Sequence, residues 1–171
     1  ARQTIKEGAT PQRLEVEFLL DGQTPAGIYL LRVASAAGIS EAVALGVDNL
    51  PQIPFAPQVP PATVAMTGAL SGSTVLSTTL AGKNDQRLTI EVECRRLGGN
   101  LDPVIHVYDA RGAQVTWSQA LPAIAGDVRT AVTLPADGEY RIELHDALYR
   151  GGEPGFFRLK VGAFHFADLV Y

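Results

Sequence analysis

The sequence predicts an all-β protein in which antiparallel strands form a two-sheet β-sandwich. Two observations lead to this prediction. Apolar and polar residues alternate with a period of two along much of the 171-residue chain, which is the pattern of half-buried strands. The 17 glycines and 11 prolines follow no fixed period and divide the chain into short segments, which excludes a coiled coil or a collagen-like helix.

The first 50 residues contain about three predicted strands. Alternation is regular over 14–18, and the segments 27–33 and 41–47 are rich in side chains that favour a pleated sheet. Three strands are few for an independently stable sheet. We therefore expect residues 1–50 to form a partial domain.

A proline-rich segment follows at 51–61, where Pro51, Pro54, Pro57, Pro60 and Pro61 interrupt the pattern. Proline fixes φ and has no N–H group to donate to a sheet. The segment is therefore predicted to be an extended linker or a strand-like connector.

Residues 62–164 hold the remaining predicted strands. These are the segments 63–67, 74–80, 88–94, 103–108, 114–118, 130–134, 140–144 and 157–161. Asp and Gly residues at 109–112 and 136–139 predict hairpin turns, because both residue types tolerate positive φ. This number of short strands suits a sandwich of about a hundred residues. The apolar tail, 165–171, is expected either to dock onto the first block or to mark a truncation.

Hydropathy and charge exclude two classes of function. The longest apolar runs, such as 42–47 and 161–166, are much shorter than the roughly 18 residues that a membrane span needs. The formal net charge is −4, with 14 Lys and Arg among 18 Asp and Glu, so no basic surface is available for a phosphate backbone. We expect no transmembrane span and no nucleic-acid partner.

The single cysteine, Cys94, excludes an intrachain disulfide. It alternates with Ile90 and Val92 on the apolar face of a predicted strand. Because no histidine is placed beside it by local sequence, it is interpreted as a buried core thiol and not as a nucleophile.

Several motifs follow one another in an order that resembles the bacterial pre-peptidase C-terminal domain. They are RRLGGNLDPV at 95–104, YDARG at 108–112, PADGEY at 135–140, DALYRGG at 146–152 and FRL at 157–159. The segments 25–33, 38–40 and 48–51 similarly resemble the end of the immunoglobulin-like segment that often precedes this domain.

The resemblance implies a jelly-roll-like β-sandwich over 62–164, preceded by a partial immunoglobulin-like β segment, in a large exported bacterial protein. It implies a non-catalytic module, not an enzyme, in a periplasmic, cell-surface or secreted location. We therefore expect a role in assembly, adhesion or spacing, with other domains or subunits of an extracytoplasmic assembly as partners. The alternative is a carbohydrate-binding module with an aromatic face and a polysaccharide ligand.

The resemblance also bears on calcium. Relatives that bind calcium carry acidic residues and Asn before the first strand of the sandwich and Asp-x-Asp in the next, whereas this chain reads VPPA at 59–62 and STVLSTT at 73–79. We expect that site to be lost. The remaining candidates for a calcium site are carboxylates at strand ends, Asp102, Asp109 and Asp146, with Asp127 and Asp137 as further members; the alternative is that they cap turns. No other cofactor is expected.

His145 and Asp146 form the candidate pair for acid–base chemistry. Adjacent strand residues point to opposite faces, which argues against a catalytic unit. His106 alternates with Val104 and Tyr108 and should share a face with them. With three histidines and one cysteine in the whole sequence, and no close spacing among them, zinc chemistry is not expected.

The candidate binding residues are Trp117, Tyr149 and Arg150. An aromatic ring and a guanidinium in a glycine-flanked loop can stack on a sugar or hold a carboxylate, whereas the alternative for Tyr149 and Arg150 is local packing. For Trp117, alternation favours burial on the inner face beside Val115. Exposure of Trp117, Tyr149 or Tyr108 on one face would instead favour the carbohydrate-binding module.

Overall fold

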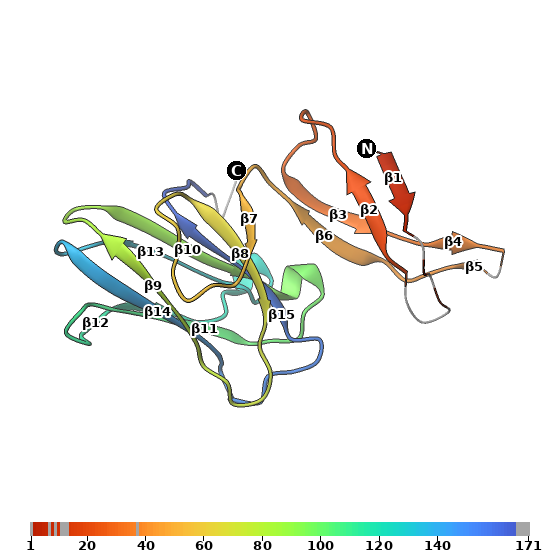
Figure 1. Ribbon diagram of the computed structural model, residues 1–171. Helices are drawn as coiled ribbons and strands as arrows, with labels where there is room; N and C mark the ends of the chain where they lie inside the picture. The colour runs from red at the N-terminus through yellow and green to blue at the C-terminus, as the bar shows by residue number, and fades with distance from the viewer. Residues whose placement is uncertain (1, 7, 9, 11–13, 37, 167–171) are drawn as a thin grey trace.

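The computed structural model describes residues 2–6, 8, 10, 14–36 and 38–166. This part of the chain is all-β, as predicted, and consists of a small first block followed by a sandwich (Figure 1). Its helical turns, η1 (Arg95–Leu97) and η2 (Pro122–Ile124), have three residues each. No helix among the described residues is long and apolar enough to span a membrane.

The sandwich has two sheets. The five-stranded sheet has the strand order β13-β10-β15-β8-β7, and the four-stranded sheet has the order β12-β11-β14-β9. In chain order the strands are β7 (Gln52–Pro54), β8 (Val64–Ala69), β9 (Leu76–Gly82), β10 (Arg87–Glu93), β11 (Pro103–Tyr108), β12 (Gln114–Ser118), β13 (Val128–Thr133), β14 (Gly138–Asp146) and β15 (Phe156–Gly162). Neighbours are antiparallel, except that β7 runs parallel to β8.

The first block contains three two-stranded ladders. β1 (Arg2–Ile5) pairs with β2 (Val16–Leu19), β3 (Gly27–Leu31) with β6 (Val43–Val47), and β4 (Ala34–Ser35) with β5 (Gly38–Ile39). The sequence pattern did not predict β1, β4 or β5, which are short and exposed on both faces. None of the described residues before position 51 is buried, so this block has little core of its own.

The segment that the sequence predicts as a linker contributes to the sandwich. β7 adds an edge strand to the five-stranded sheet, where proline is tolerated because one side of the strand has no neighbour. The N–H of Phe55 donates to the carbonyl of Thr67 at 2.7 Å, and that of Val59 to Thr79 at 2.8 Å. The Val59 side chain belongs to the core.

The core lies between the two sheets. On β10 the inner face carries Leu88, Ile90 and Val92, followed by Cys94, and all four are buried as the alternation predicts. The other face of β10 differs from the prediction of a half-buried strand, because Glu91 is buried there as well. The central strands of this sheet are therefore covered on both faces.

The chain after β15 crosses the outer face of the five-stranded sheet. The Thr89 hydroxyl donates to the carbonyl of Phe164 at 3.1 Å, and the Arg129 guanidinium lies 4.3 Å from the centroid of the Phe166 ring. Of the tail expected at 165–171, residues 167–171 lie outside the described part of the chain.

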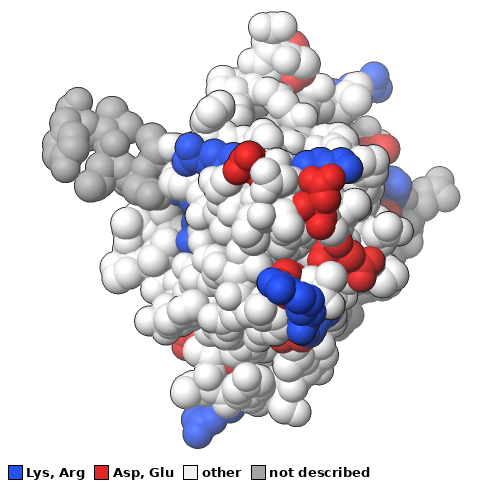
Figure 2. Space-filling model, turned by 90° about the vertical axis from the view of Figure 1, so that its left-hand side faces the viewer, with Lys and Arg blue, Asp and Glu red and all other residues white. Residues whose placement is uncertain are grey.

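Three turns gather at one end of the sandwich, those between β9 and β10, β11 and β12, and β13 and β14. Here Asp137 pairs with Lys83 at 3.2 Å and accepts the N–H of Asn84 at 2.7 Å, while Asp109 pairs with Arg111 at 3.1 Å. In Figure 2 acidic and basic side chains form small neighbouring groups on a mostly uncharged face.

Candidate functional site

Five aromatic rings lie together on the outer face of the four-stranded sheet. Tyr108 and His106 come from β11, Trp117 from β12, His145 from the end of β14 and Tyr149 from the loop that follows. We call this group the aromatic face. Trp117 is opposite His106 in the β11–β12 ladder, and β14 pairs with β11 on its other side, so the group runs across three neighbouring strands.

The rings of the aromatic face are nearly parallel. His145 and Tyr149 stack, with centroids 4.5 Å apart and planes at 5°. The planes of His106 and His145 differ by 14° and their centroids lie 5.3 Å apart. His106 has Trp117 on one side, at 6.3 Å, and Tyr108 along its own strand, at 5.9 Å. His106 shares its face with Tyr108, as the alternation predicts.

Trp117 lies on the outer face, and the expectation that it shares the inner face with Val115 is wrong. The reason is a β-bulge: Val107 is opposite Thr116, but Tyr108 is opposite Gln114, which leaves Val115 as an extra residue. Val115 packs against the core, whereas the Trp117 side chain is 52% exposed. An extra residue changes the parity of a strand.

The Tyr149 loop is organised by the carboxylate of Asp146. It accepts the backbone N–H groups of Asp102 at 3.0 Å, Leu148 at 3.0 Å and Arg150 at 3.2 Å. Burial raises the pKa of Asp146, but these hydrogen bonds outweigh it and hold the pKa below its ordinary value. The result is a fixed loop that presents the half-exposed Tyr149 ring.

Backbone conformation in this loop is unusual. Tyr149 has a φ of +54°, a conformation that is uncommon for a residue with a side chain and that persists where surrounding contacts impose it. Gly151 has a φ of +47°, and a Cβ there would lie 2.6 Å from the backbone nitrogen of Gly72. Only glycine fits this position, because the β8–β9 connection is so close.

Arg150, the third candidate binding residue, has an exposed side chain. A different arginine contacts the aromatic face: the Arg141 guanidinium lies 4.7 Å from the centroid of the Tyr108 ring, in the geometry of a cation–π contact. Arg141 is also ion-paired with Glu143 on the same strand. The sequence alone did not single out Arg141.

His145 and Asp146 do not form an acid–base unit. The His145 ring is directed at His106, with the two Nε2 atoms 3.2 Å apart, and its Nδ1 bonds the backbone carbonyl of Asp146 at 2.9 Å. The Asp146 carboxylate instead serves the loop amides. The neighbouring Asp102 carboxylate is ion-paired with Arg95.

The three carboxylates expected to hold calcium occupy both ends of the sandwich. Asp102 and Asp146 are neighbours at one end, whereas Asp109 follows β11 at the opposite end, where it accepts the N–H groups of Arg111 and Ala113 at 2.9 Å. Within the described residues, no group of three or more His, Cys, Asp or Glu side chains is arranged to hold a metal ion. The calcium site stays a prediction.

A second cluster of charges covers the outer face of the five-stranded sheet. Its members lie in η1, on β10, β13 and β15, and just before β13, and we call it the ion cluster: Glu91, Glu93, Arg96, Asp127, Arg129, Arg158 and Lys160. Burial raises the pKa of Glu91, but hydrogen bonds from Arg129 and Arg96 outweigh it and lower the pKa. Asp127 is fully buried and accepts the N–H groups of Cys94 and Arg95 at 2.9 and 2.7 Å.

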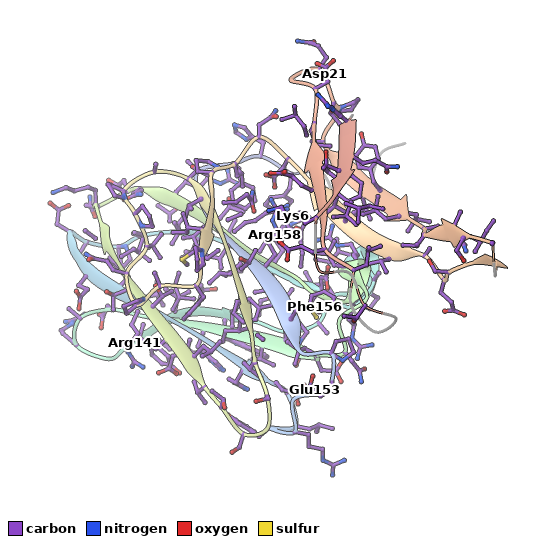
Figure 3. All side chains as sticks on the ribbon, turned by 45° about the vertical axis from the view of Figure 1, so that its right-hand side comes forward. Lys6, Asp21, Arg141, Glu153, Phe156 and Arg158 are labelled. Carbon is purple, nitrogen blue, oxygen red and sulfur yellow. The ribbon has the colours of Figure 1, made fainter. Side chains whose placement is uncertain are left out.

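The ion cluster joins the first block to the sandwich. Asp48, just after β6, lies 2.6 Å from Arg158 and 3.4 Å from Lys160, and both cations also bind Glu93, at 2.9 and 2.6 Å. In Figure 3 Arg158 lies where β15 meets the first block, and Arg141 lies away from it. The alternation indicated that Glu93, Arg158 and Lys160 lie on the polar faces of their strands, but not that this face is covered.

Cys94 behaves as a core residue. It is fully buried, and burial raises the pKa of its thiol to about 11. At neutral pH it is therefore protonated and a poor nucleophile.

Comparison with known proteins concerns the fold. No family model and no curated relative matches the sequence. The solved pre-peptidase C-terminal domain of a collagenase from Bacillus anthracis matches with a TM-score of 0.50 and 13% identity, over 68% of this chain and 100% of that chain. PliG of Aeromonas hydrophila, a periplasmic inhibitor of g-type lysozyme, matches with a TM-score of 0.45 and 16% identity, over 68% of this chain and 100% of that chain. A mutant of PliG from Escherichia coli matches with a TM-score of 0.43 and 10% identity, over 66% of this chain and 97% of that chain.

The collagenase domain confirms the fold that the turn motifs predict. At this identity the likeness extends to the arrangement of strands and not to ligands. The immunoglobulin-like assignment of residues 1–50 stays a prediction. The chain thus contains an antiparallel β-sandwich of the kind found in a pre-peptidase C-terminal domain.

Proposed function

We propose that the chain is a non-catalytic, extracytoplasmic binding module and that the aromatic face binds a polysaccharide. The observation that carries the proposal is the exposure of Trp117 and Tyr149, 52% and 50%, at the two ends of a row of nearly parallel rings. Exposed aromatic side chains of this kind present a rigid apolar surface with a polar edge.

The shape of the aromatic face suits an extended ligand. Its exposed rings flank the less exposed His106 and His145, and the row crosses β12, β11 and β14. A sugar ring has an apolar C–H face that packs on an aromatic ring, and hydroxyl groups at its rim that bond polar neighbours. Arg141 and Glu143 of the same sheet face supply such polar groups.

A non-catalytic role is supported by the state of the candidate catalytic groups. Among the described residues, Cys94 is buried and protonated, and the Asp146 carboxylate is occupied by backbone amides. The resemblance of the motifs to the pre-peptidase C-terminal domain, together with the shared fold, supports an extracytoplasmic location in a larger protein.

The test is retention on a panel of purified insoluble polysaccharides: cellulose, chitin, xylan and peptidoglycan. We expect the wild-type chain to be retained on one of them, and Trp117→Ala and Tyr149→Ala to weaken retention by about tenfold or more, the size typical of a central aromatic contact. Tyr29→Ala, which removes a partly exposed ring from the first block, is the matched control. Retention that Trp117→Ala and Tyr149→Ala leave unchanged, or no retention at all, would contradict the proposal.

A second candidate function is assembly with another protein through the first block. It is favoured by the large apolar side chains that this block exposes, among them Ile5, Leu19, Leu30, Ile39 and Val43, each at least 62% exposed. A monomeric protein rarely leaves so much apolar surface uncovered. The test is a pull-down from a cell-envelope extract, in which a protein retained by the wild type and by Trp117→Ala should be lost with Leu30→Ser combined with Ile39→Ser.

A further inference from the structure

A chain of hydrogen bonds runs through the floor of the aromatic face. Gln114 Oε1 lies 2.9 Å from His106 Nδ1, His106 Nε2 lies 3.2 Å from His145 Nε2, and His145 Nδ1 lies 2.9 Å from the carbonyl oxygen of Asp146. The two imidazoles lie edge to edge, because their centroid separation of 5.3 Å exceeds the Nε2 separation by about twice the radius of the ring. Each Nε2 therefore faces the other.

The carbonyl at the end of this chain fixes the direction of the bonds. A carbonyl oxygen only accepts, so His145 carries its proton on Nδ1 and, when neutral, presents a lone pair at Nε2. His106 must then donate from its own Nε2. In the neutral pair, His106 Nδ1 accepts a hydrogen bond from the side-chain NH2 of Gln114. A half-turn of the Gln114 amide exchanges its oxygen and its nitrogen.

While the two rings face each other, the pair can take up one proton but not two. The first proton goes to Nδ1 of His106, where Gln114 Oε1 accepts it, and every bond in the chain is kept. A second proton would have to go to His145 Nε2. Two N–H groups would then face each other at 3.2 Å, and two like charges would be adjacent.

Charged groups around the pair do not remove this conflict. On β14, Glu143 is opposite His106 in the ladder but is ion-paired with Arg141. β11 and the loop contribute the phenols of Tyr108 and Tyr149, and β12 contributes the uncharged Gln114 and Trp117. The Asp146 carboxylate faces the loop amides.

We infer that His106 and His145 form a proton-controlled switch on the aromatic face. This inference rests on the proposed function and adds its regulation. Uptake of the second proton separates the two rings, and His145 then leaves its stacked position against Tyr149. The aromatic face therefore holds its ligand while the pair carries one added proton or none, and releases it when acidification adds the second.

The first measurement is made on the wild-type protein without a ligand. Long-range ¹H–¹⁵N NMR spectra report the tautomer and charge of each histidine, and His165, which is exposed, is the internal reference. We expect His145 as the Nδ1–H tautomer, a first protonation step on His106, and a second step at lower pH that also shifts the Tyr149 ring signals. An Nε2–H tautomer at His145, or two histidines that titrate as His165 does, would overturn the inference.

The second measurement is binding to the polysaccharide retained in the panel, at about pH 7.5 and at a pH below the second step of the NMR titration, with a chelator present so that protons are the only cation varied. We expect wild-type binding to weaken about tenfold or more at the lower pH. His106→Gln keeps a donor for His145 and removes one titrating ring. The affinity of this variant should therefore differ less than about twofold between the two pH values. Equal pH dependence in wild type and variant would overturn the switch.

The two measurements separate the two proposals. If no polysaccharide is retained but the NMR titration shows the coupled steps and the Tyr149 shift, the proposed ligand is wrong and the proton switch stands. If a polysaccharide is retained through Trp117 and Tyr149 with no pH dependence, the ligand stands and the switch is wrong.

Discussion

The carboxylate of Asp146 accepts a hydrogen bond from the backbone N–H of Asp102 at 3.0 Å, across 44 residues of sequence. The same carboxylate caps two N–H groups of its own loop. It therefore connects the start of β11 to the loop that carries Tyr149, and the position of the exposed Tyr149 ring depends on this buried carboxylate.

Asp146→Asn should lower stability and loosen this loop. The uncharged Asn side chain cannot accept the three hydrogen bonds as the carboxylate does. We therefore expect the free energy of unfolding to fall by about 1–3 kcal/mol. Chemical denaturation measures this loss, and the near-ultraviolet circular dichroism of the tyrosines reports the loop. Asp21→Asn, at an exposed turn carboxylate that accepts one N–H, is the control. Equal stability of the two variants would contradict the role assigned to Asp146.

Acidification should destabilise the folded chain as the pH falls through the ordinary titration range of carboxyls and below it. The pKa values of Glu91, Asp109, Asp137 and Asp146 are all lowered in the folded state, so the unfolded chain binds protons first. Their contribution to stability is present above the unfolded values of about 3.9 for Asp and 4.3 for Glu and is lost as the pH falls through the folded values. Unfolding curves between about pH 7 and pH 3 measure this loss. A free energy of unfolding that stays constant over that range would count against these hydrogen bonds.

Asp48→Asn should release the first block from the sandwich. It removes the charge that faces Arg158 and Lys160 and leaves Glu93 as the carboxylate that they share, a change that costs several kcal/mol where a pair is fully buried and less at this partly exposed position. Hydrogen exchange of β3 and β6 should accelerate about tenfold or more, while that of β10 stays the same. Glu41→Gln, an exposed acid of the same block, should change neither. Unchanged exchange in β6 would show that the ion cluster does not hold the block.

Cys94 should resist thiol reagents in the folded protein. Because burial raises its pKa to about 11, the reactive thiolate is scarce at about pH 8, and the reagent has no access to it. We expect modification about a hundredfold slower than in the denatured chain, measured by mass spectrometry. Glutathione in the same buffer is the reference, and reaction at its rate would contradict the core position.

Sequence pattern alone placed most strands of the sandwich because burial has a simple signature there. Alternation over 88–94 separates Ile90 and Val92 from Glu91, and that separation follows directly from the pleat of a strand. The turn motifs at 109–112 and 136–139 fixed the bends between strands. Cys94 could be assigned to the core on the same ground.

The pattern failed where a bulge or a contact from outside the strand decided the outcome. Trp117 was expected on the inner face, and the bulge at Val115 reversed it, because a single extra residue changes which side every later residue faces. The alternation predicts that Glu91 lies on the exposed face of its strand. It is buried because Arg96 from η1 and Arg129 from β13 lie against it. Both arginines lie outside β10, so the alternation along β10 does not show that they contact Glu91.

The sequence by itself determined the all-β class, the positions of the sandwich strands and the inner face of β10, since these depend on the local alternation of apolar and polar residues. Only the tertiary structure decided that His106 and His145, 39 residues apart, face each other, because this depends on the register between β11 and β14. The Asp146 loop brought Tyr149 onto His145, and the register between β11 and β12 placed Trp117 beside His106. The aromatic face, made of residues from three strands and a loop, is a product of strand pairing, which local sequence does not encode.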